Sequence, residues 1–254
     1  MKRYLVLICL GMLVFAAWAD DAYRDFTDTQ GRTLRGRVLS FDGRKDMVTI
    51  ELENKRKATG AVAGFSEADQ QYIRAWGLLE GVRSESKLKI SIERRKVKSW
   101  NEKHYGSVTA GGESEGTQVT GKTNYEEEGF DIVFFSRNEC VIKGLTLEYC
   151  IYYEQEVLQG QVAQTGVLYG FIPIDGVTPN DKKVISTDSV CVFEYATGEQ
   201  FINAYELKGE IMGLSWRLFL VADGEKTLVR EATYPDSLSS SYAWVTESKR
   251  VGKN

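Results

Sequence analysis

The chain of 254 residues is poor in the residues that bind metals or form disulfides, with four cysteines and one histidine. One cysteine, Cys9, lies in an apolar segment near the N-terminus. The other three, Cys140, Cys150 and Cys191, include no Cys-x-x-Cys pair and have no histidine near them, so their spacing is not that of a zinc site. Three thiols cannot all pair within one chain, which leaves one disulfide with one buried thiol, or three buried thiols.

Groups that could perform catalysis are also scarce. The single histidine, His104, would be the only base for a Ser-His-Asp or Cys-His arrangement, and we expect it to be structural or exposed. Residues 126–128 are three glutamates, but adjacent strand residues point to opposite faces, which indicates a solvated acidic strand start. The glycine-rich residues 111–116 lack the helix and lysine of a phosphate-binding loop and indicate a flexible turn, or at most a calcium contact. We therefore expect a non-enzymatic protein with no cofactor and no metal centre.

The N-terminus has the three parts of a secretory leader. Met1–Arg3 is basic, Tyr4–Ala16 is apolar, and Ala17-Trp18-Ala19 is a small-x-small cleavage signal. The apolar part is too short for a membrane span, which needs about 20 residues, so an uncleaved anchor is the weaker alternative. We expect residues 1–19 to be a cleaved signal peptide, and the remaining chain to be secreted or periplasmic without a membrane span.

The charge balance argues against nucleic-acid binding. The net charge of −4 becomes −6 without the leader, because the leader carries two basic residues and no acidic one. The only possible exception is the basic run Glu93–Lys98, and it alternates with apolar residues, which favours a solvated strand face over a patch for phosphates. We therefore expect the partners to exclude nucleic acid.

Period-two alternation of apolar residues dominates the chain beyond residue 87. The alternating sets that predict strands include Leu88/Ile90/Ile92, Phe130/Ile132/Phe134, Leu145/Leu147/Tyr149/Ile151/Tyr153, Val167/Tyr169/Phe171, Cys191/Phe193/Tyr195 and Trp216/Leu218/Leu220. Turn-forming pairs such as Asp175-Gly176 and Asp223-Gly224 lie between them. This pattern predicts an immunoglobulin-like antiparallel β-sandwich over residues 88–254. Residues 78–87 are predicted to be a polar linker.

Residues 20–77 predict a separate small unit. The alternating positions Leu34–Val38 and Val48–Leu52 indicate two strands, and Asp42-Gly43 and Asn54 mark turns. Ser66-x-x-Asp69 is a helix N-capping arrangement, which predicts one short helix packed on the sheet. The expected fold of this unit is a small SH3-like β-barrel with one short helix, so that the whole chain is mainly β.

The layout of residues 26–76, about a fifth of the chain, resembles the Sla-one homology domain. This small β-barrel-like module of endocytic adaptors also occurs in bacterial envelope proteins. The resemblance implies binding of Asn-Pro-Phe-x-Asp peptides, with basic side chains contacting the aspartate. The residues it places in that role are Lys55, Arg56 and Lys57, with Arg44 and Lys45 as further candidates. The alternative is a solvated basic hairpin. The chain also has Gly60-Ala61 where relatives commonly have an apolar-Pro pair.

Tyrosines provide another candidate binding surface. Period-two placement turns Tyr149 and Tyr153 toward the core and leaves Tyr152 as the exposed aromatic contact. The aromatic residues of 234–244 are expected to pack across one end of the sandwich. The leading hypothesis is an exported protein that recognises a protein or peptide ligand in the envelope or extracellular space. The alternatives are a carbohydrate-binding or carbohydrate-active β-sandwich and a purely structural role.

Overall fold

The structure, a computed structural model, describes residues 23–110, 113–158, 160–198, 205–222, 224–240 and 242–251. The predicted signal peptide and Gly111-Gly112 lie outside these residues. The chain is mainly β, with 63% of residues in strands and 11% in helices, so the prediction of a mainly β chain with an antiparallel β-sandwich is confirmed. It divides after Ala75 into two compact units, and helix α1 (Glu67–Arg83) begins in the first and ends in the second. No helix among the described residues combines the length and apolar character needed to cross a membrane.

The first unit contains a four-stranded antiparallel sheet in the order β1-β2-β3-β4. Its strands are β1 (Arg24–Thr27), β2 (Thr33–Asp42), β3 (Met47–Leu52) and β4 (Lys57–Ala61), followed by the 3-10 helix η1 (Val62–Gly64). The predicted alternation is observed, since Val38, Val48 and Ile50 are buried. Phe26 is fully buried and its ring lies 6.0 Å from the ring of Phe65, edge to face. These side chains form the core of the unit.

The start of α1 is fixed by the predicted cap. The Asp69 amide donates to Ser66 Oγ at 3.3 Å, and the Ser66 hydroxyl donates to the Asp69 carboxylate at 2.8 Å. That buried carboxylate also accepts from the Thr27 amide and from the Arg24 guanidinium, each at 2.8 Å. Asp69 therefore joins β1 to the helix N-terminus through three donors.

The helix is longer than expected, because residues 78–83 of the predicted linker are helical and only residues 84–87 lack regular structure. Trp76, Leu79 and Val82 lie at helical spacing and are buried, so continuing the helix buries an apolar stripe that a linker would expose. Gly81 is required within it, since a Cβ there would overlap the side chain of Asn138, whose Nδ2 donates to the Gly81 carbonyl at 3.1 Å.

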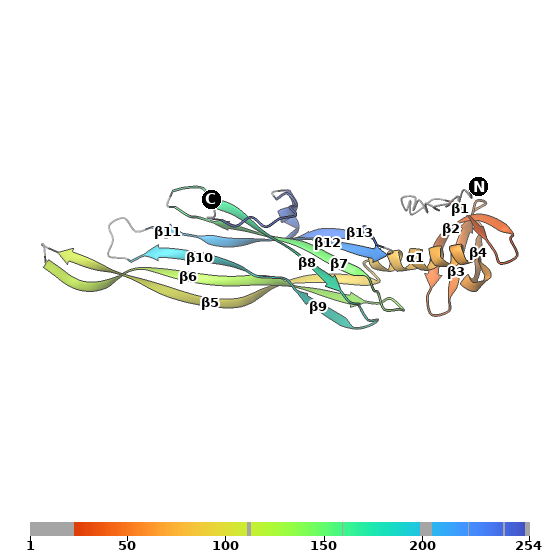
Figure 1. The fold of residues 1–254 in the computed structure, drawn as a ribbon, viewed down its shortest axis with the longest axis horizontal. Coiled ribbons are helices and arrows are strands. Elements are labelled where there is room, and N and C mark those ends of the chain that lie inside the picture. Colours follow the sequence, from red (N-terminus) through yellow and green to blue (C-terminus); the bar gives the residue numbers. More distant parts are fainter. Residues whose placement is uncertain are drawn as a thin grey trace, which may run out of the picture. The chain divides into compact units, whose positions relative to one another are not determined.

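The second unit is built from two antiparallel sheets (Figure 1). The first sheet has the order β11-β10-β6-β5, with β9 also paired to β6, and the second has the order β13-β12-β7-β8. The strands of the first sheet are β5 (Leu88–Ala110), β6 (Glu113–Ser136), β9 (Lys182–Ser186), β10 (Val190–Thr197) and β11 (Glu206–Leu207). Those of the second are β7 (Leu145–Gln155), β8 (Gln164–Ile174), β12 (Gly209–Ala222) and β13 (Glu225–Tyr234), with the 3-10 helix η2 (Asp236–Ser240) after them.

Most of the alternating sets predicted from the sequence supply the core of this unit, but Val167/Tyr169/Phe171 on β8 and Cys191/Phe193/Tyr195 on β10 point away from it, and Phe171 and Cys191 are exposed. In the first sheet Phe130, Ile132 and Phe134 are fully buried, and in the second sheet Leu147 and Ile151 are fully buried. We call the faces that carry these residues the inner faces, and the opposite ones the outer faces. On the inner face of β8, Gly166 and Gly170 lie opposite Tyr153 and Tyr149, and their missing side chains leave room for the rings of these tyrosines.

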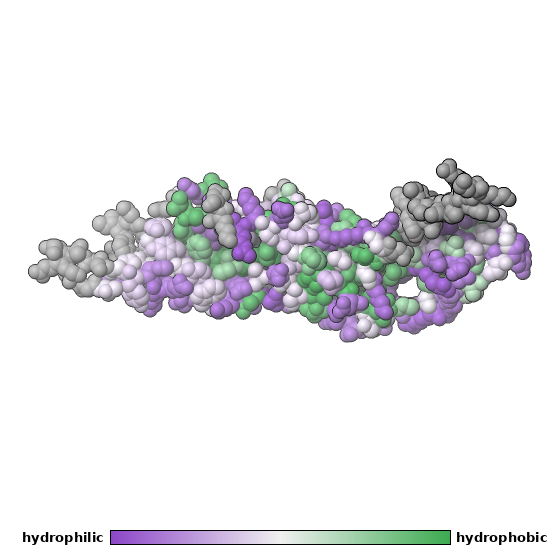
Figure 2. All heavy atoms as spheres, viewed as in Figure 1, coloured by the Kyte–Doolittle hydropathy of each residue, from purple (hydrophilic) through white to green (hydrophobic). Residues whose placement is uncertain are grey.

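Strands β5 and β6 form a hairpin that extends past the other strands of its sheet (Figure 1). The pairing of β10 with β6 ends at Thr197 and Gly121. Beyond this point the Gly198 amide still donates to the Thr120 carbonyl at 3.0 Å, and further out the described residues of β5 and β6 pair with each other up to Ala110 and Glu113. In Figure 2 hydrophilic residues predominate over the coloured part of the β5–β6 hairpin, whereas hydrophobic residues gather over β8 and β9. Three register shifts interrupt the hairpin, the first at Val97.

Candidate functional site

Three aromatic side chains lie side by side on the outer face of the first sheet of the second unit. Register pairs Trp100 of β5 with Tyr125 of β6, and Tyr125 with Phe193 of β10. The rings of Trp100 and Tyr125 are stacked, with centroids 4.9 Å apart and planes 9° apart. The Tyr125 and Phe193 centroids are 6.2 Å apart. We call these three residues the aromatic ladder. Their neighbour Val192 is buried on the inner face, so the ladder points away from the sandwich core.

Charged side chains border the aromatic ladder. Lys98 Nζ lies 4.7 Å from the centroid of the Trp100 ring, within the range of a cation–π contact. The Tyr125 hydroxyl donates to the Glu102 carboxylate at 3.3 Å. Burial, together with this carboxylate, raises the pKa of Tyr125, so the hydroxyl stays protonated and able to donate at neutral pH. The ladder is therefore a half-buried apolar centre within a polar rim.

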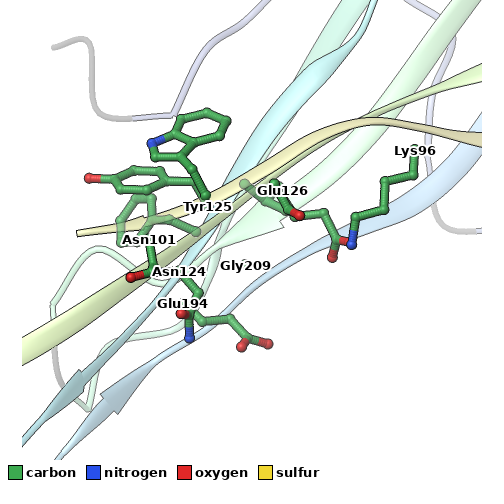
Figure 3. Close-up of a pocket in the computed structure, with 11 residues that line it drawn as sticks. Lys96, Asn101, Asn124, Tyr125, Glu126, Glu194 and Gly209 are labelled. Atoms are coloured by element: carbon green, nitrogen blue, oxygen red, sulfur yellow. The ribbon is translucent and has the colours of Figure 1, made fainter. Parts of the chain in front are cut away.

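The opposite face of the same strands carries a polar cleft of about 360 Å³. It lies where the second sheet ends, beside Gly209, the first residue of β12. Figure 3 shows Lys96 and Glu126, which form an ion pair, and a group made of Asn101, Asn124 and Glu194 from three neighbouring strands. The cleft therefore offers carboxamides, carboxylates and an ammonium group to one small volume. The remaining lining residues are Ser99 and Val192, together with Trp100, Tyr125 and Phe193 of the aromatic ladder, whose rings lie on the other face of the sheet.

The single histidine, His104, lies on the face that carries the aromatic ladder. It is exposed, which is one of the two states, structural or exposed, that we expected from the sequence. His104 Nε2 is 2.7 Å from Thr123 Oγ1, and its ring packs edge to face against Tyr195 at 5.5 Å. No group of three or more His, Cys, Asp or Glu side chains that could hold a metal ion occurs among the residues the structure describes.

The predicted basic residues of the first unit do not form one site. Arg44 and Lys45 lie in the turn before β3, whereas Lys55, Arg56 and Lys57 lie in the turn after it and at the start of β4. The six residues of β3 separate the two groups by roughly 20 Å at the strand rise of about 3.3 Å per residue. Any peptide contact of the kind that the resemblance implies would therefore involve one turn or the other.

Within the second turn, Lys55 is held by its neighbours. Its φ of 66° places it in the left-handed region, and its Nζ lies 3.1 Å from Glu51 Oε1 and 3.0 Å from the Tyr23 hydroxyl. The Tyr23 hydroxyl donates to Glu51 at 2.6 Å, and this hydrogen bond, with that of Lys55, lowers the pKa of Glu51 to about 2. Hydrogen bonds to Tyr23 and Glu51 raise the pKa of Lys55. Lys55 and Lys57 are both exposed, and Lys55 is the one that forms an ion pair with Glu51.

The prediction that Tyr152 is an exposed contact is wrong, because its side chain is 2% exposed. It does point to the outer face of β7, as the alternation requires, but residues 242–251 cover that face. Its hydroxyl donates to the Ala243 carbonyl at 3.0 Å and its ring lies 4.9 Å from the ring of Tyr242. Burial raises the pKa of Tyr152 to about 12.

The three cysteines within the described part of the chain are free thiols, of which Cys150 is buried and Cys140 and Cys191 are exposed. Neither of the two states expected from the sequence, one disulfide or three buried thiols, is therefore observed. The aromatic residues of the tail pack on the sandwich as predicted, but Tyr242 and Trp244 lie on the outer face of the second sheet, against the cluster that contains Cys150 and Tyr152, and not across one end.

The aromatic ladder was missed in the sequence because Trp100 and Tyr125 lie 25 positions apart. The alternation in residues 88–92 and 130–134 indicates a hairpin, but only its register decides which residues face each other. The shift at Val97 sets this register.

No family model and no curated protein matches the chain. A crystal structure from Akkermansia muciniphila is similar over 57% of this chain and 70% of that chain, at 12% identity and a TM-score of 0.25.

Proposed function

We propose that the protein is an exported, non-enzymatic protein of the cell envelope that binds a protein ligand through the aromatic ladder. The single observation that carries this proposal is the in-register stack of Trp100, Tyr125 and Phe193 on an outer sheet face. Tryptophan and tyrosine are enriched at the centres of protein interfaces, where a polar rim surrounds them. Export rests on the leader-like residues 1–19.

The ring geometry favours a protein over a sugar at this surface. A flat sugar stacks on an exposed ring face. The Tyr125 ring has Trp100 stacked against one side at 4.9 Å and Phe193 tilted toward it at 6.2 Å. The ladder therefore presents ring edges and polar groups, which suit the side chains of a protein partner.

The first unit supports the same proposal through its resemblance to a peptide-binding module. Its exposed cation Lys57 could contact a ligand carboxylate, whereas Lys55 is engaged by Glu51 and Tyr23. A labelled Asn-Pro-Phe-x-Asp peptide, titrated against the chain from Asp20 onward, tests this part. Lys57→Glu should weaken binding, whereas Lys45→Glu, at the other end of β3, should leave it unchanged. Equal affinities for both variants would contradict the assignment.

Capture from envelope extracts tests the ladder. We expect Trp100→Ala to lose a protein that the wild type retains, and the affinity of that purified protein to fall at least about tenfold. Phe171→Ala is the matched control, because Phe171 lies on the second sheet and is 65% exposed. A protein retained equally by the wild type and both variants would contradict the role of the ladder.

The polar cleft gives a second candidate function, carbohydrate binding. Its carboxamides and carboxylates, Asn101, Asn124, Glu126 and Glu194, can donate to and accept from sugar hydroxyls. A glycan array probed with the wild type and with Asn124→Ala distinguishes the two functions. Binding lost in this variant would support the sugar site, and a blank array would remove it.

A further inference from the structure

The outer face of the second sheet carries a groove that is filled by the chain's own C-terminal residues 242–251, which we call the strap. The groove is lined by Cys150, Tyr152, Val167, Tyr169 and Met212. Tyr242, Trp244 and Val245 of the strap pack against it. The described end of the chain is therefore seated on the sandwich as an extended segment.

The strap pairs with the edge of the sheet through its backbone. The Val167 amide donates to the Lys249 carbonyl at 2.7 Å, and the Lys249 amide donates to the Val167 carbonyl at 2.8 Å. The Tyr169 amide donates to Ser248 Oγ at 3.0 Å. Strand β8 is an outer strand of its sheet, so these contacts have the form of a peptide added to a sheet edge.

Two aromatic side chains anchor the strap. Tyr242 lies 4.9 Å from the ring of Tyr152, and its hydroxyl donates to Glu154 at 2.7 Å. Trp244 packs edge to face on Tyr169 at 6.4 Å, and the Arg217 guanidinium lies over its ring at 4.2 Å. An aromatic-x-Trp sequence is therefore what the groove accommodates, with one cation placed over the tryptophan.

The rest of the strap is weakly held. Thr246, Glu247, Ser248, Lys249 and Arg250 are all exposed. Segments with few buried contacts and exposed backbone hydrogen bonds open at low free-energy cost. The strap is held by Tyr242, Trp244, the Val167–Lys249 backbone pair and a few side-chain hydrogen bonds, and its release would break these contacts while leaving the strand pairing of both sheets intact.

We propose that this groove is a peptide-binding site for an extended partner segment with an aromatic-x-Trp sequence, and that the strap is its resident competitor. The partner segment would pair with β8 and place its tryptophan between Tyr169 and Arg217. Because the strap is tethered to the same molecule, it competes at a high effective concentration and lowers the apparent affinity for a free segment. This site is separate from the aromatic ladder, so either can fail without the other.

The test uses the full chain and a fluorescein-labelled peptide with the sequence of residues 242–251. Trp244→Ala in the protein removes the resident anchor and leaves the groove residues intact. We expect this variant to bind the peptide at least about tenfold more tightly than the wild type, by fluorescence anisotropy. Adding Arg217→Ala to the variant should weaken that binding, because the groove loses its cation. A peptide carrying alanine in place of its tryptophan is the matched control and should not bind.

A folded Trp244→Ala variant with the same peptide affinity as the wild type would overturn the proposal, as would binding that survives in the alanine peptide. Circular dichroism shows whether the variant is folded. If it is not, Lys249→Pro replaces it, since proline removes the amide that donates to Val167 at an exposed position. The proposal is then overturned if Lys249→Pro binds the peptide with the affinity of the wild type, or if it binds the alanine peptide.

Discussion

The carboxylate of Asp69 should be the most sensitive single group in the first unit. It is 4% exposed and accepts from three donors, the Arg24 guanidinium, the Thr27 amide and the Ser66 hydroxyl. Asp69→Ala removes the acceptor for all three. A hydrogen bond to a charged group contributes about 1.5–3 kcal/mol and a donor left buried costs a further 1–3 kcal/mol. We therefore expect a loss of about 3 kcal/mol in the free energy of unfolding of this unit.

Arg24→Ala is the comparison that tests the reasoning. Truncating Arg24 leaves the Asp69 carboxylate with its two other donors, the Thr27 amide and the Ser66 hydroxyl. The Arg24 side chain is 36% exposed, so water already solvates part of it and the ion pair that is lost is a weak one. This variant should lose about 1 kcal/mol. Asp69→Asn keeps the shape and one acceptor oxygen, and should fall between the two.

Hydrogen exchange of the β1 and β2 amides, followed by mass spectrometry, measures these free energies in the full chain. It reports the first unit separately from the second, which circular dichroism would not. Equal losses for Asp69→Ala and Arg24→Ala would refute the argument, because they would mean that the ion pair alone, and not the shared carboxylate, stabilises the unit.

Three further predictions concern Glu51, the cysteines and Gly213. The pKa of Glu51 is lowered from 4.5 to about 2, so its stabilising contribution is complete above pH 4.5 and is lost as the pH falls toward 2; a Glu51 side-chain carbon titration by NMR with a midpoint near 4.5 would contradict this. Cys140 and Cys191 should react with a thiol reagent in the native protein, whereas Cys150, buried and with its pKa raised by burial, should react only after unfolding. Gly213→Ala should destabilise the second unit by about 2 kcal/mol in thermal unfolding, because the added methyl group would overlap the backbone oxygen of Tyr234, the last residue of β13; an unchanged melting temperature would show that this end of β13 can move aside.

Much of the strand content could be predicted from the sequence because alternation is a local signal. Leu147 and Ile151 recur at period two, and they are buried as that period requires. The cap at Ser66 was equally local. These features depend on residues within one turn or one strand, so no knowledge of distant segments is needed.

The candidate sites depended on distant segments and were harder to predict. Tyr152 points outward as expected, yet it is buried because the strap, some 90 residues later, covers it. Pairing Trp100 with Tyr125 requires the irregularity at Val97, and a slip of one residue would place Trp100 opposite Asn124 instead. The prediction of a linker at residues 78–87 was wrong because it was based on two glycines and several polar residues. The apolar stripe of Trp76, Leu79 and Val82, which is buried in the structure, indicates a helix instead.

The length of the β5–β6 hairpin beyond Gly121, which we call the arm, can differ without a change in the rest of the second unit. Beyond Gly121 the described residues of the two strands pair with no third strand, so residues could be added or removed there without touching the sandwich core. Removing two residues from each strand would shorten the arm by about 7 Å and keep every side chain on its own face. Removing one residue from each strand would move the side chains beyond the deletion to the opposite faces of the hairpin. A change of two residues in each strand would therefore alter the length of the arm without changing which side chains lie on each face.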